Sequence, residues 1–194
     1  MKKIAPAVND KNPIDGHAPA VTGNDLQKYV SAGITTDHEC FRLKGALEKI
    51  GLGMKILIRE GSAAKNFEAL VPLIATHPDS LMFCSDDKHP DELVKGHIDE
   101  LVRRAIALGY NVIDVVKTAS LNAVKHYKLN VGMLQEGDDA DFIVVDNLRD
   151  PVAKQTYIKG RLVAENGVSN IKVVETKTPN HFNTPFIQTS DLFV

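Results

Sequence analysis

The stretch Met54-Lys55-Ile56-Leu57-Ile58-Arg59-Glu60 is the clearest strand signal in the chain, and it ends in two charged residues. A helix is expected next, capped by Ser62 and running to about Thr76, because Phe67, Leu70, Val71 and Ile74 fall on one helical face. The pattern then repeats, since Leu81-Met82-Phe83-Cys84 is apolar and Ser85-Asp86-Asp87 is polar. A strand, a polar cluster and a helix therefore form the repeating unit.

Two similar units precede this stretch. Residues 13–19 are followed by an expected helix from about Asn24 to Ala32, and residues 34–40 by one from Leu43 to Ile50. Further helices are expected around 90–108 and 113–127. Strands that alternate with helices predict an α/β fold with a parallel sheet. An open doubly wound sheet is the alternative, although no glycine-rich phosphate turn is present.

Polar residues recur where the predicted strands end. His17, His38, Glu60 and Asp86 follow one another at steps of 21, 22 and 26 residues, which suits successive units of a (β/α) barrel. Four units are half of an eight-stranded barrel, and a half-barrel leaves sheet edges open. We therefore expect association, as a homo-oligomer or with a complementing half-barrel, unless the chain is part of a longer protein.

Composition narrows the class of protein. The 194 residues carry a formal net charge of −2 without a basic stripe, which argues against nucleic-acid binding. No run approaches the length that spans a membrane, and the first ten residues do not read as a signal peptide. Cys40 and Cys84 are too few for a disulfide scaffold, so a cytoplasmic location is expected.

The character of the sequence changes after Tyr127. A turn-rich stretch leads to an expected strand at 142–146 and a hairpin over 155–164 that turns at Lys159-Gly160. The predicted divisions are a barrel part over 1–128, a small β module over 129–170 and a tail or a further domain over 171–194. Within this tail, residues 171–174 could form a strand.

Two imidazoles and a carboxylate at one barrel mouth form a donor set for a divalent ion such as Zn, Mn or Fe. We predict His17, His38 and Asp86 as the metal ligands, with Asp86 also moving protons as a catalytic group. Asp87 is the alternative to Asp86, and either aspartate could instead cap the next helix.

Three further residues lie beside the predicted ligands. Glu39 is a candidate catalytic residue that orients a ligand or contacts substrate, or it faces solvent. Glu60 and Ser62 are candidate substrate-binding residues, while capping of a helix is the favoured alternative for Ser62.

Four motifs together resemble the bacterial adenine deaminases of the amidohydrolase superfamily. They are Asp15-Gly16-His17-Ala18-Pro19, Thr36-Asp37-His38-Glu39-Cys40, residues 58–66 (IREGSAAKN) and residues 83–90 (FCSDDKHP). The stretch Thr118–Ala123 with Gly132, Gly137 and Ala140-Asp141-Phe142 resembles the passage from barrel to β module across that superfamily.

The resemblance implies strands 5–8 of a metal-dependent (β/α)8 barrel followed by part of a β domain. It implies hydrolytic deamination of adenine to hypoxanthine and ammonia in purine salvage, with manganese or iron favoured and zinc as an alternative. His17 would match the ligand on the fifth strand, His38 that on the sixth and Asp86 the aspartate of the eighth.

The superfamily's His-x-His pair of the first strand is absent, since no two histidines lie two residues apart. The chain therefore resembles the second half of such an enzyme, and it is expected to be inactive alone. The alternatives are another amidohydrolase that acts on a cyclic amide or aminopurine, and a non-catalytic truncated half-barrel.

Overall fold

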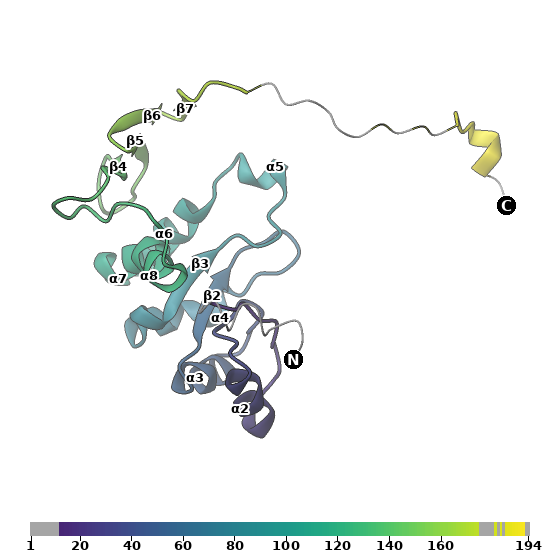
Figure 1. Cartoon of the computed structure of the whole chain (residues 1–194), viewed down its shortest axis with the longest axis vertical. Coiled ribbons are helices and arrows are strands. Elements are labelled where there is room, and N and C mark those ends of the chain that lie inside the picture. The colour runs from purple at the N-terminus through teal and green to yellow at the C-terminus, as the bar shows by residue number, and fades with distance from the viewer. Residues whose placement is uncertain (1–11, 175–180, 182, 184, 193–194) are drawn as a thin grey trace.

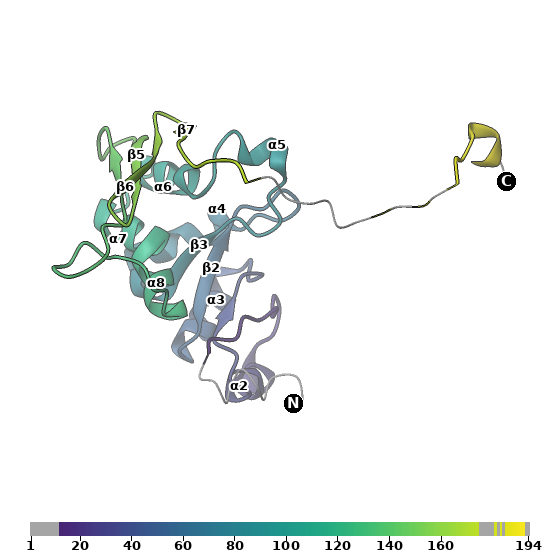
Figure 2. The ribbon, with the colours of Figure 1, turned by 45° about the horizontal axis from the view of Figure 1, so that its top comes forward.

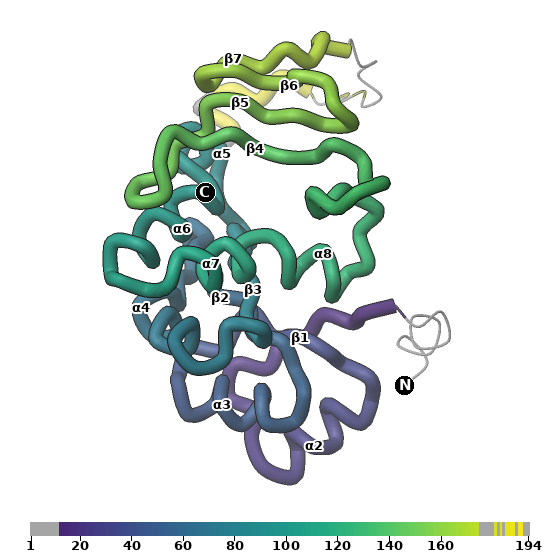
Figure 3. The backbone as a smooth tube through the Cα atoms, turned by 90° about the vertical axis from the view of Figure 1, so that its left-hand side faces the viewer, coloured from purple at the N-terminus to yellow at the C-terminus, as the bar shows by residue number. Residues whose placement is uncertain are grey.

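The computed structural model describes residues 12–174, 181, 183 and 185–192. Its fold is a mixed α/β arrangement in which a parallel sheet with helices is followed by a small antiparallel sheet (Figure 1). The parallel sheet has the order β1-β2-β3, and the antiparallel sheet has the order β4-β5-β6-β7. Figure 3 shows the two sheets at different places along the molecule, with α6, α7 and α8 between them.

The parallel sheet is formed by β1 (Thr36–Asp37), β2 (Lys55–Arg59) and β3 (Leu81–Cys84). Thr36 of β1 pairs with Lys55 of β2, and Arg59 at the end of β2 pairs with Cys84 of β3. The intervening helical segments are α3 (Leu43–Gly51), α4 (Phe67–Leu70) and the two 3-10 turns Val71–Ala75 and Pro78–Ser80. The three strands and α3 appear where the alternating pattern predicts them, whereas α4 begins later than predicted.

The core lies between the sheet and these helices. Ile56 and Ile58 of β2 are fully buried, whereas Lys55, Leu57 and Arg59 are half-buried. This alternation follows from the two-residue period of a strand, which turns successive side chains to opposite faces. Burying each isoleucine contributes about 2 kcal/mol of transfer free energy.

The helical face predicted after β2 is confirmed, because Phe67, Leu70, Val71 and Ile74 are all buried. The predicted start of that helix at Ser62 is wrong, since α4 begins at Phe67 with Asn66 as its N-cap residue. The Ser62 hydroxyl instead donates to Glu92 Oε2 and accepts the backbone N–H of His89.

The predicted strand over residues 13–19 is also absent. This segment follows an irregular extended path. The Thr35 N–H donates to the Ile14 carbonyl at 2.9 Å, and the Val21 N–H donates to the Ala18 carbonyl at 3.4 Å. Pro13 and Pro19 have no N–H to give to a ladder, which disfavours a strand here. The segment precedes α2 (Gly23–Ser31), whose Leu26 packs with Ile34 and Met54 in a second buried cluster.

The helices that follow β3 pack back on it. Figure 2 shows α6 and α8 close to β3. The elements are α5 (Pro90–Leu93), α6 (Ile98–Ala107), α7 (Val112–Val116), a π-helical turn (Lys117–Leu121) and α8 (Asn122–Tyr127). No helix in the described ranges is long and apolar enough to cross a membrane.

The antiparallel sheet comprises β4 (Phe142–Val145), β5 (Ala153–Ile158), β6 (Arg161–Glu165) and β7 (Val168–Ser169). The predicted hairpin with its turn at Lys159-Gly160 is confirmed, because β5 and β6 pair across it. Residues 171–174 are not a strand. A last 3-10 turn, Thr189–Leu192, lies away from both sheets in Figures 1 and 2. Much of the tail beyond 174, including Pro179 and Asn180, is outside the described residues.

Candidate metal centre

Two histidines from separate loops meet beside the carboxyl end of β1. The rings of His17 and His38 lie 4.6 Å apart in an edge-on arrangement. Together with Glu39 they form one group within the described part of the chain. One possible ligand atom of each of the three residues lies within 4.8 Å of those of the other two. Two imidazoles and a carboxylate fit a zinc, manganese or iron ion.

The two histidines differ in exposure. The His17 side chain is 70% exposed and that of His38 is 15% exposed. His17 Nδ1 lies 3.4 Å from Glu39 Oε1, so the carboxylate of Glu39 contacts the more exposed ring. The structure thus brings the predicted ligands His17 and His38 together, with Glu39 beside them.

The predicted ligand Asp86 contacts His38 and Arg59 but does not belong to the group formed by His17, His38 and Glu39. Its Oδ1 is 3.8 Å from His38 Nε2, and its Oδ2 accepts a hydrogen bond from Arg59 Nη1 at 2.6 Å. Asp86 has φ +46°, in the left-handed region that non-glycine residues seldom adopt, although aspartate tolerates it. The turn after β3 therefore directs this carboxylate back towards His38 and Arg59.

Arg59 is a residue of this group that the sequence analysis did not single out. Its guanidinium contacts Asp86 and also lies 4.0 Å from Glu39 Oε1, so one half-buried cation lies beside both carboxylates. The available signal was strand alternation, because Arg59 shares its face of β2 with Leu57, one of the half-buried positions.

Glu60 and Ser62 do not join this group. Glu60 follows the buried positions Ile56 and Ile58 on the helix-facing side of β2, and its Oε2 accepts a 2.7 Å hydrogen bond from Arg104. Glu60 lines a charged hollow beside α5 and α6, together with Arg104 and Glu92. Ser62 lies next to this hollow, because its hydroxyl donates to Glu92.

Cys84 is not suited to act as a thiolate at neutral pH. Burial raises the pKa of the Cys84 thiol to about 12, and the nearby Asp86 carboxylate adds to the rise. Cys40 is fully buried, with Sγ 3.5 Å from the Arg42 carbonyl. Cys40 belongs to the main buried cluster as a small apolar residue, whereas Cys84 is half-buried at the end of β3.

Asn66 holds the His38 loop against β2. Its side-chain carbonyl accepts the Arg59 N–H at 2.7 Å, and its amide donates to the carbonyls of Cys40 at 2.9 Å and His38 at 3.3 Å. Asn66 is 5% exposed. Loss of its hydrogen-bond partners would leave a buried polar group unsatisfied and would lower the stability of the fold.

Three comparisons place the chain among known proteins. Residues 1–163 match the amidohydrolase family. The adenine deaminase of Sulfurovum sp. (strain NBC37-1) is 54% identical over 194 residues, and that of Salinibacter ruber is 53% identical over the same length. In both cases the whole chain is covered, and it spans 36% of the relative's length.

Among solved structures, the β-aspartyl dipeptidase of Fervidobacterium islandicum AW-1 in complex with a β-Asp-Leu dipeptide superposes with a TM-score of 0.60. The match covers 80% of this chain and 48% of the dipeptidase at 18% identity, so it supports the fold alone. The family match extends over most of the chain and includes both histidine loops, β2 and β3. The chain belongs to the amidohydrolase family.

Proposed function

We propose that this chain carries one part of the metal centre of an adenine deaminase, which hydrolyses adenine to hypoxanthine and ammonia. The observation that carries the proposal is the convergence of His17, His38 and Glu39 in a chain about half identical, over its full length, to proteins named adenine deaminase. The chain spans 36% of the length of the Sulfurovum relative. The complete deamination reaction is therefore part of what we propose.

Manganese or iron is the proposed metal, with zinc as the alternative. His17 and His38 would bind the ion. Asp86, whose Oδ1 lies 3.8 Å from His38 Nε2, would be the third ligand. Such an ion supplies Lewis acidity and lowers the pKa of water to near neutrality.

The residues of the chain have distinct parts in this proposal. Asp86 Oδ1, the oxygen that faces His38, takes the proton of the attacking water and passes it to the departing amine. A C–O bond forms at the ring carbon that bears the amine, and the C–N bond breaks to release ammonia. Arg59 holds Asp86 Oδ2, so the carboxylate keeps Oδ1 towards the reacting atoms. Glu39 orients His17 through Nδ1.

Glu60 and Ser62 would contact the substrate if the hollow beside α5 and α6 were open to it. Their present partners, Arg104 and Glu92, occupy the polar atoms that a purine would need. Arg59 and Asp86 are better placed, since both lie next to the histidines.

The proposed architecture is the second half of a (β/α)8 barrel over 1–128, a β module over 129–170, and a tail or a further domain from 171. Its support is the parallel order β1-β2-β3, the polar residues at the carboxyl ends and the likeness to the dipeptidase fold. The remaining barrel strands and ligands would come from another segment, a second copy or a complementing chain.

The test measures ammonia release from adenine with Mn²⁺. It uses the 194-residue chain and a chimera in which the chain replaces its matching segment in the Sulfurovum enzyme. The chimera is expected to release ammonia and to lose at least about 100-fold in kcat on His38→Ala, because a ligand is removed. A folded, metal-loaded chimera that is inactive on adenine but active on another aminopurine or a cyclic amide would contradict the proposed substrate.

A further inference from the structure

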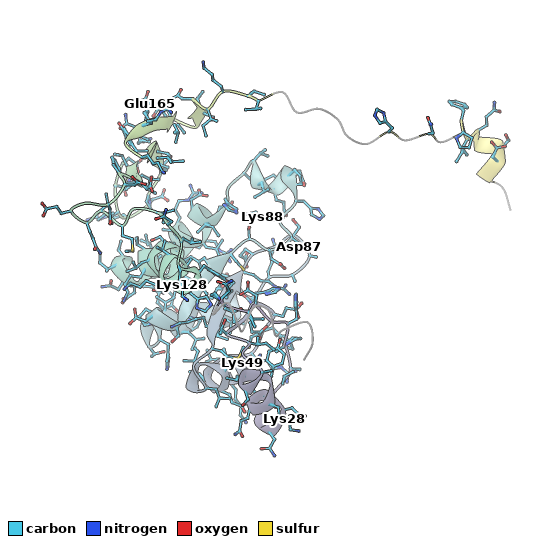
Figure 4. All side chains as sticks on the ribbon, viewed as in Figure 1. Lys28, Lys49, Asp87, Lys88, Lys128 and Glu165 are labelled. Atoms are coloured by element: carbon cyan, nitrogen blue, oxygen red, sulfur yellow. The ribbon has the colours of Figure 1, made fainter. Side chains whose placement is uncertain are left out.

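A completely buried ion pair lies directly behind the two histidines. Lys49 of α3 and Asp37 of β1 are both fully inaccessible, with Nζ 2.7 Å from Oδ2. Figure 4 labels Lys49 on α3, at the end of the molecule where α2 and α3 lie. The proposed reaction does not use either residue.

The hydrogen bonds of this pair connect the two loops that carry the histidines. Asp37 Oδ1 accepts the backbone N–H of Ala18 at 3.2 Å and that of Glu39 at 3.0 Å. Lys49 Nζ also donates to the Ala18 carbonyl. Ala18 directly follows His17, and Asp37 and Glu39 flank His38. A single carboxylate therefore joins the backbone beside one histidine to the backbone beside the other.

The pair is placed beneath the site and not within it. Asp37 lies opposite the buried Ile56 in the β1–β2 ladder, on the side of the sheet that α3 covers. His38 is the next residue, in the bend that follows β1, and its side chain is 15% exposed whereas that of Asp37 is inaccessible. Ala18 is fully buried although the neighbouring His17 side chain is 70% exposed, so the ion pair holds the His17 loop at its buried side. Hydrogen bonds of Asp15 with Thr36 and Tyr127 also hold this loop.

Burial of two charges is costly, and a well-packed apolar pair would serve stability as well or better. An apolar pair could not accept two N–H groups and donate to a carbonyl at the same time. The feature that this pair supplies is thus the connection between the loops.

We propose that Asp37 and Lys49 are positioning residues that hold His17 and His38 at the separation a shared metal ion requires. The metal in this inference rests on the proposed function, whereas the connection between the loops rests on the hydrogen bonds alone.

The first test is Lys49→Met in the full chain, read by amide hydrogen exchange without metal. The amides of Ala18 and Glu39 are expected to exchange at least about tenfold faster, because Asp37 loses the partner that orients it, while those of Ile56 and Ile58 stay protected. Unchanged protection at Ala18 and Glu39 in a folded variant would overturn the proposal.

The second readout is the affinity for Zn²⁺ and for Mn²⁺ alone, measured by titration calorimetry. Lys49→Met is expected to weaken binding roughly 10- to 100-fold, as loss of a supporting residue does at other metal sites. The control is Leu101→Ala, which destabilises α6 in the main core and removes no hydrogen bond of either histidine loop. If Leu101→Ala weakens binding as much, the effect follows stability and the proposal is wrong.

Lys49→Met leaves a buried carboxylate unpaired and could fail to fold. The double variant Asp37→Asn with Lys49→Met removes both charges and keeps one acceptor oxygen for the two N–H groups. It is expected to fold and to expose the Ala18 amide to faster exchange, since the Ala18 carbonyl loses the Lys49 ammonium and keeps the longer, 3.4 Å bond from the Val21 N–H. Both loops remaining as protected as in the parent chain would overturn the proposal. If the parent binds neither ion, the metal assignment fails and the exchange data alone decide the connection.

Discussion

At the scale of single residues, the candidate centre depends on groups that come from different loops. His17 and His38 lie 21 residues apart in the chain and have rings 4.6 Å apart in space. Arg59 joins the carboxylates of Glu39 and Asp86, and Asn66 ties the His38 loop to β2. The centre is therefore a network of ion pairs and backbone contacts.

His126 offers a pH-dependent prediction at this scale. Burial lowers the pKa of its imidazole below the ordinary value of 6.5, and its Nε2 lies 3.4 Å from Thr35 Oγ1. The unfolded chain then binds the proton more readily, so this residue's contribution to stability is present above pH 6.5 and is lost as the pH falls through its folded pKa.

We expect the unfolding free energy, measured in urea, to fall between pH 7.5 and pH 5.5, and to fall less in His126→Asn. An NMR titration of the His126 ring should give a midpoint below 6.5. A midpoint at or above that value would show that burial does not govern this side chain.

At the scale of elements, the local backbone decides where helices end. Gly51 is the last residue of α3, and a Cβ added there would meet nothing within 4 Å. Gly53 lies in the turn before β2 with φ +87°, which L-residues rarely adopt. The two glycines are two residues apart and have opposite requirements.

Gly51→Ala is expected to raise the free energy of unfolding by up to about 1 kcal/mol, because alanine loses less backbone entropy in a helix. Gly53→Ala should lower it by about 1 kcal/mol or more, because alanine is strained at a positive φ. Urea unfolding of both variants beside the parent chain checks the pair. Equal effects of the same sign would mean that the turn before β2 relaxes freely.

At the scale of the whole molecule, the parallel sheet has two unpaired edges within the described residues. β1 and β3 are the outer strands of the order β1-β2-β3, and both are short. Open edges and uncovered apolar side chains promote association. Exposed apolar side chains include Phe41, Leu43, Leu47, Ile113 and Ile143.

We expect the isolated chain to associate as its concentration rises, as a homo-oligomer or with a complementing half-barrel. Sedimentation velocity between about 5 and 200 µM is the measurement, with hydrogen exchange of β1 and β3 amides alongside it. A sharp monomer over that range with protected edge amides would be incompatible with the half-barrel proposal.

The sequence by itself determined the alternation of strands and helices, the buried face of residues 67–74 and the hairpin at Lys159-Gly160, since these depend on local periodicity and turn chemistry. It also indicated His17 and His38 through their place in the repeat. The tertiary structure alone decided the irregular path of residues 13–19, the separation of Glu60 and Ser62 from the histidines, and the ion pairs of Arg59, Asp37 and Lys49. Those depend on which side of a strand each residue occupies and on contacts between distant segments, and short-range sequence patterns do not contain that information.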